Sequence, residues 1–162
     1  DLIKAINNKF SNSLSVKVCA LESGDINYKY PGEVKYILKT SLEASYRKLT
    51  RDINKDRQIK IVLIQHEFGF FKQNEQPFLQ LLNNITKPVV IAFHTVLPGP
   101  DKQLKLYIES IADASESIIV MTLNSAQILI NEYGIPKQKI TVIAHGTHLV
   151  PHLNKELLKE KY

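Results

Sequence analysis

Histidine, carboxylate and hydroxyl side chains follow several apolar stretches of this sequence, and such side chains can bind a substrate or transfer a proton. They stand at or directly after the ends of the stretches, as Gln65-His66-Glu67, His94-Thr95, Thr122 and His145-Gly146. In open α/β sheets, ligands bind outside the carboxyl ends of the strands. If the apolar stretches are parallel strands of one sheet, these side chains meet along one edge, and we expect a single site there.

Three kinds of chemistry are open to such a cluster. Imidazole and carboxylate groups can bind a polyhydroxylated substrate, because they supply directional hydrogen-bond donors and acceptors. Zinc is the second, since His145, His148 and His152 are spaced three and four residues apart, although a nearby glycine and proline oppose the helix that this needs. Nucleophilic hydrolysis is the third, but there is no G-x-S-x-G motif, and the single cysteine, Cys19, lies inside an apolar stretch. We expect no metal site.

The composition is that of one globular domain. The chain has 162 residues, 44% of them hydrophobic and 23% charged. A chain of this length buries roughly 68–70% of its unfolded surface, which is enough for one core. No apolar run reaches the ~18 residues of a membrane span, and residues 1–4 show no signal-peptide pattern. Because a single cysteine also fits a reducing compartment, these features predict a soluble, cytoplasmic protein.

The net charge of +5, with an isoelectric point of about 9.2, would permit an anionic partner. The excess is spread along the chain, and residues 39–60 carry seven basic side chains against three acidic ones. We interpret this segment as a solvated helix face and predict no nucleic-acid partner, with a basic nucleic-acid-binding domain as the weaker alternative.

The order of apolar patterns predicts the fold class. Short runs rich in Val and Ile, without strict alternation, are typical of strands in a parallel sheet: Leu14–Leu21, Val34–Leu38, Ile59–Gln65, Val89–His94, Ile118–Met121 and Ile140–Ile143. Helical patterns lie between them: Leu42–Asn54, Asn74–Ile85, Asp101–Ser115 and Ala126–Tyr133. We therefore expect an α/β fold with a doubly wound, mainly parallel sheet flanked by helices over residues 1–150, followed by a surface helix or tail over residues 151–162.

Several residues are typical of helix ends. Pro100 is expected in the first turn of one helix, and Asn124 with Gln127 has the spacing of a capping box. Gly134 followed by Pro136 predicts a helix stop.

Five segments together resemble the N-terminal half of family-4 (group 1) glycosyltransferases: residues 65–69 (QHEFG), 88–97 (PVVIAFHTVL), 119–122 (IVMT), 133–135 (YGI) and 139–146 (KITVIAHG). Residues 30–34 (YPGEV), with Tyr46, Ile53 and Asn54, are similar to a bacterial branch of that family. The resemblance runs from about Val16 to Gly146.

This resemblance implies a GT-B architecture, in which two Rossmann-like domains face a cleft and a sugar is transferred with retention of configuration. His94 then corresponds to the histidine that reaches toward the donor sugar and the reacting centre. The acceptor side would be lined by His66, Glu67, Thr95 and Thr122, and His145 and Gly146 would lie at the cleft edge. No cofactor is expected in this chain, because the nucleotide-sugar donor would bind the C-terminal domain.

The sequence also departs from the family. Its members begin with a strand and a glycine-rich loop, whereas this chain opens at Asp1 with a helix pattern, and Phe70–Asn74 replaces a usual glycine pair. We therefore expect a first strand and the donor domain to be missing, and an acceptor-side domain that is inactive without its donor-binding partner. The expected partners are that domain and a sugar acceptor, with peripheral membrane contact and self-association left open. The alternative is a noncatalytic Rossmann-like binding or assembly module.

Overall fold

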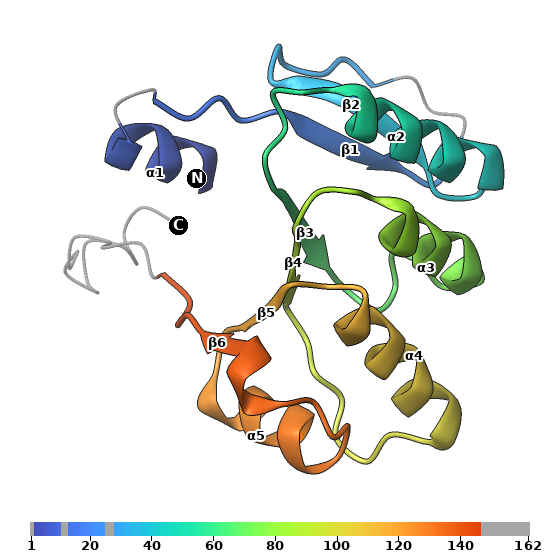
Figure 1. The fold of residues 1–162 in the computed structure, drawn as a ribbon, viewed down its shortest axis with the longest axis vertical. Coiled ribbons are helices and arrows are strands. Elements are labelled where there is room, and N and C mark those ends of the chain that lie inside the picture. The colour runs from blue at the N-terminus through green and yellow to red at the C-terminus, as the bar shows by residue number, and fades with distance from the viewer. Residues whose placement is uncertain (1, 11–12, 25–27, 147–162) are drawn as a thin grey trace, which may run out of the picture.

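The computed structural model describes residues 2–10, 13–24 and 28–146, and helices alternate with strands along most of their length (Figure 1). The elements are α1 (Leu2–Phe10), β1 (Val18–Glu22), β2 (Val34–Lys39), α2 (Glu43–Lys55), β3 (Val62–His66), α3 (Glu75–Asn84), β4 (Val89–Phe93), α4 (Lys102–Asp113), β5 (Ser117–Val120), α5 (Leu123–Asn131), the 3-10 turn η1 (Lys137–Lys139) and β6 (Ile140–Val142). None of the described helices is long and apolar enough to cross a bilayer.

All strand pairs in the described residues are parallel. The strands form a four-stranded sheet in the order β3-β4-β5-β6 and a separate pair, β1-β2. Helices α2, α3 and α4 lie side by side along one side of the strands, and α1 lies on the other side (Figure 1). The predicted Rossmann-like α/β fold is confirmed.

The strands do not form one continuous sheet. Within the described residues, β1 pairs only with β2 and β3 pairs only with β4, so each keeps one edge without a strand partner. The two sheets are connected through their helices, since Asn54 at the end of α2 donates its side-chain amide to the Asn84 carbonyl of α3 at 2.8 Å. The same Asn54 accepts a hydrogen bond from the backbone N–H of Thr86 at 2.9 Å. These bonds hold α2 beside α3 and place the β1-β2 pair next to the larger sheet.

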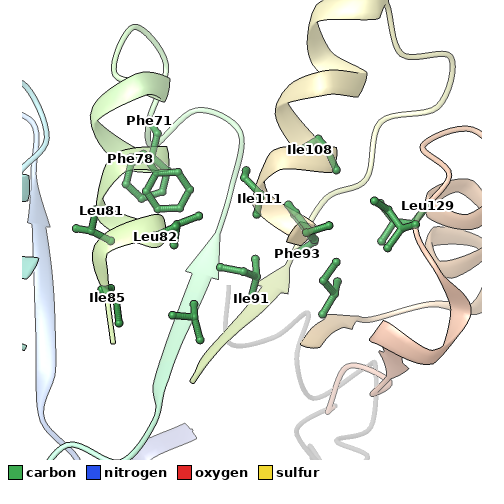
Figure 2. Packing of buried hydrophobic residues seen from close by; sticks show 14 of the residues in the cluster. Phe71, Phe78, Leu81, Leu82, Ile85, Ile91, Phe93, Ile108, Ile111 and Leu129 are labelled. Atoms are coloured by element: carbon green, nitrogen blue, oxygen red, sulfur yellow. The ribbon is translucent and has the colours of Figure 1, made fainter. Parts of the chain in front are cut away.

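One layer of the core lies between the four-stranded sheet and helices α3 and α4. Figure 2 shows Phe78 and Leu82 of α3 and Ile111 of α4 directed toward Ile91 and Phe93 of β4. Ile91 and Ile111 are 0% exposed. Full burial of one such side chain contributes roughly 1.5–3 kcal/mol of transfer free energy. This layer therefore fixes the strands whose carboxyl ends carry the polar residues.

Two helices begin at different residues from those predicted. Asp101 caps α4 and Thr122 caps α5, each with extended backbone and a side-chain oxygen that accepts from the N–H three residues on. A carboxylate or hydroxyl in that conformation satisfies a free N–H of the first turn. Pro100 therefore lies before α4, and Asn124 lies inside α5, so both predicted starts are wrong. The predicted helix stop at Gly134 is confirmed, since α5 ends at Asn131 and Gly134 follows it with a φ of +70°.

Candidate functional site

The carboxyl ends of β3 to β6 lie along one edge of the parallel sheet, and we call the polar residues there the rim: Gln65, Glu67, His94, Thr95, Thr122 and His145. The rim follows directly from the topology, because parallel strands in sequential order all end on the same side. His148, His152 and the predicted tail over residues 151–162 lie outside the described residues.

His94 follows β4 and is fixed by two contacts with β3. Its backbone N–H donates to the His66 carbonyl at 3.1 Å, which extends the β3-β4 pairing by one residue. Its ring Nε2 lies 2.6 Å from the side-chain Oε1 of Gln65. The ring is nevertheless exposed. A side chain that is held in place and also accessible is what a substrate-binding group requires.

Glu67 and Thr95 form a second connection between the loops after β3 and β4. The Thr95 hydroxyl donates to Glu67 Oε2 at 2.9 Å, and the backbone N–H of Phe68 donates to Glu67 Oε1 at 3.1 Å. Each carboxylate oxygen can accept more than one hydrogen bond. Glu67 can therefore still bind a substrate hydroxyl while it connects the loops after β3 and β4.

His145 and Thr122 contribute to the rim in different ways. The ring centroids of His145 and His94 are 6.1 Å apart, so these two imidazoles are neighbours. The Thr122 hydroxyl accepts from the Ser125 N–H at 2.9 Å and donates to the Ser125 Oγ at 2.8 Å. Thr122 is thus occupied by the start of α5, and its contact with an acceptor stays a prediction. Gly146 is exposed beside His145.

The His66 side chain does not reach the rim. It is 1% exposed, and neither ring nitrogen has a hydrogen-bond partner among the described residues. Its ring contacts the aromatic rings of Phe68, Phe71, Phe78 and Phe93 at centroid distances of 4.9 to 5.8 Å. Burial disfavours the imidazolium ion and lowers the pKa of His66 to about 4, although the nearby Glu67 carboxylate partly opposes this.

The expectation that the His66 imidazole lines the acceptor side is therefore wrong. The reason is the alternation of side chains along β3, in which His66 is buried against Phe78 of α3 while the preceding Gln65 is exposed. The sequence places Gln65 at the end of this strand together with His66 and Glu67, but no binding role was predicted for it. Because Val62, Leu63 and Ile64 are all apolar, the sequence of β3 carries no alternation that separates Gln65 from His66.

The described residues limit the chemistry that the rim can perform. They contain no cluster of three or more His, Cys, Asp or Glu side chains placed to hold a metal ion. Cys19 lies in β1, outside the four-stranded sheet, and burial raises the pKa of its thiol to about 11. A thiol with so high a pKa is a poor nucleophile at neutral pH. The rim therefore offers imidazole, carboxylate, amide and hydroxyl groups, which suit binding and orienting a hydroxylated ligand.

No protein-family model matches the sequence, and no curated protein matches it. The Rossmann-like fold is established by the structure alone.

Proposed function

We propose that this chain is the acceptor-side domain of a retaining glycosyltransferase. The reaction would move a sugar from a nucleotide-sugar donor to a glycan, lipid or small-molecule acceptor. It would need a donor-binding domain in addition to this chain. The resemblance of the rim segments to family-4 (group 1) glycosyltransferases supports the assignment.

The observation that carries the proposal is the placement of His94 and Glu67. These two groups come from different strand ends, and each is fixed by a neighbour on the other strand end, His94 by Gln65 and Glu67 by Thr95. Both can form hydrogen bonds with sugar hydroxyls. Groups held in this way orient an acceptor hydroxyl for attack on the anomeric carbon, which is catalysis by positioning.

The test uses the full-length protein, a panel of sugar nucleotides, and glycan and lipid acceptors. We expect transfer with at least one pair, and a loss of roughly 100-fold in kcat/KM for His94→Ala, as when a positioning contact is removed. Gln80→Ala, at an exposed position of α3, is the matched control and should keep full activity. Absence of transfer by the wild type with every pair, or full activity of His94→Ala, would overturn the proposal.

A noncatalytic binding or assembly module is the second candidate. Two observations favour it: His66 is used by the core, and β1 and β3 each have an edge without a strand partner in the described residues. Such a module would bind a glycan at the rim, with a Kd that His94→Ala weakens, and would transfer no sugar. Calorimetric titration with the acceptors alone, beside the transfer assay, distinguishes the two candidates.

A further inference from the structure

The contact between Gln65 and His94 sets the position of a proton. An amide oxygen only accepts hydrogen bonds, so the ring nitrogen that faces it must carry a hydrogen. In the structure this nitrogen is Nε2, 2.6 Å from the Gln65 Oε1. In the neutral imidazole the other nitrogen, Nδ1, then has a free lone pair. Nδ1 of His94 has no hydrogen-bond partner among the described residues, so it is available to a ligand.

The sheet holds Gln65 in the position that this contact needs. Gln65 is paired in register with Ala92, and the His66 carbonyl accepts from the His94 N–H at 3.1 Å. Between Gln65 and Glu67, the buried His66 side chain anchors the end of β3 among aromatic rings. The backbone on both sides of the contact is therefore fixed, and only the side-chain torsions of Gln65 and His94 remain to be set.

We propose that Gln65 is a positioning residue that holds His94 in the Nε2–H tautomer and so presents Nδ1 as a hydrogen-bond acceptor for a hydroxyl of the substrate. The identity of that hydroxyl as part of a sugar acceptor rests on the proposed function, whereas the tautomer does not. Without Gln65, the ring would divide between both tautomers, and only part of the population would accept a hydroxyl proton at Nδ1.

The tautomer can be measured by long-range ¹H–¹⁵N NMR correlations of the histidine rings at about pH 9, where an ordinary imidazole is neutral. His94→Ala identifies the signals of His94. In the wild type we expect the pattern of a single Nε2–H tautomer. We also expect a detectable Nε2–H proton, since the hydrogen bond slows its exchange with water.

Each substitution of Gln65 should give a different pattern of ¹H–¹⁵N correlations for the His94 ring. Gln65→Glu keeps an acceptor oxygen and should keep the Nε2–H tautomer. Gln65→Lys offers only a donor and should move the proton to Nδ1, and Gln65→Leu should give a mixture without a protected proton. Gln80→Leu, at an exposed position of α3, is the matched control and should leave the His94 signals unchanged. A wild-type Nδ1–H tautomer, or wild-type signals in Gln65→Leu, would overturn the positioning role.

Activity gives a second and separate readout. Gln65→Leu should lower kcat/KM for the acceptor by roughly tenfold, as for the loss of one hydrogen bond. Gln65→Glu should restore most of it when assayed near pH 9, because at lower pH the new carboxylate favours the imidazolium ion, which has no free lone pair at Nδ1. If the wild type transfers no sugar while the tautomer follows Gln65 as expected, the proposed function fails and the positioning role stands. If sugar is transferred but the tautomer does not depend on Gln65, the positioning role fails and the proposed function stands.

Discussion

The ring of His66 lies 4.9 Å from the ring of Phe93, centroid to centroid, with an angle of 71° between the planes. Such surroundings favour the neutral imidazole, because burial among aromatic rings removes the water that solvates a positive charge, and the nearby Glu67 carboxylate opposes this only in part. The pKa of His66 is lowered accordingly from 6.5 to about 4. This histidine therefore couples the stability of the β3 end, and of the rim beside it, to pH.

Acid is predicted to weaken the fold through His66. Between about pH 6.5 and pH 4 the unfolded chain binds a proton at His66 that the folded chain does not, so the free energy of unfolding falls as the pH falls through this range. The full difference is about 3 kcal/mol. This loss of unfolding free energy is absent above pH 6.5 and complete below about pH 4. Urea unfolding at pH 7, 5.5 and 4 measures it.

The matched variant is His66→Phe, which keeps an aromatic ring at this position but removes the ionisable group. The pH dependence of the wild type should exceed that of His66→Phe by about 3 kcal/mol. Carboxylates titrate in both proteins, so their contribution to the pH dependence cancels when the two proteins are compared. Equal pH dependence in the two proteins would show that His66 is not the group responsible.

The parallel fold could be predicted because its core strands are apolar on both faces. Ile91 and Ile118 are 0% exposed, and they lie in runs whose composition marks them as buried strands. The direction of each side chain at the rim was harder to predict. In β3 the residues Val62, Leu63 and Ile64 are all apolar, so no alternation shows which face the following His66 takes.

The placement of His66 depends on packing between distant segments. The residues that enclose it include Phe78 of α3 and Phe93 of β4, which only the folded chain brings beside the end of β3. The contact between Gln65 and His94 likewise joins side chains 29 residues apart. Such pairings follow from the register of β3 on β4, and the sequence pattern specifies the strands without specifying this register.

The start of α5 is predicted to depend on Thr122 and to be insensitive to Asn124. Thr122→Ala removes the side-chain acceptor of the Ser125 N–H and should cost about 1 kcal/mol of stability. Thr122→Ser keeps that acceptor and should cost much less. Asn124→Ala changes an exposed side chain within the helix and should be nearly neutral. Thermal or urea unfolding of the three variants tests this, and an Asn124→Ala effect as large as that of Thr122→Ala would contradict the observed cap.

The Thr95 hydroxyl is predicted to orient Glu67 more than to stabilise the fold. Thr95→Val removes the 2.9 Å bond to Glu67 Oε2, and because the pair is exposed the loss should be below about 1 kcal/mol. If Glu67 binds the proposed acceptor, the free energy of acceptor binding should fall by more than the free energy of unfolding does, because the Glu67 carboxylate loses one of the two hydrogen bonds that orient it. Thr141→Val on β6, also exposed, is the control for the change in side-chain type. A stability loss without any change in acceptor affinity would assign the pair to the fold alone.

Cys19 is predicted to react slowly with thiol reagents while the protein is folded. The pKa of its thiol is raised from 9.0 to about 11 by burial, although a hydrogen bond with the backbone of Leu38 partly opposes the shift. At pH 8 this lowers the thiolate fraction by roughly 100-fold, and the thiolate is the form that reacts. Iodoacetamide labelling followed by mass spectrometry should therefore be slow in buffer and fast in urea, with Cys19→Ala as the unlabelled control. Equal rates in the two conditions would mean that the thiol is open to solvent in the folded protein, which its place in β1 beside the core opposes.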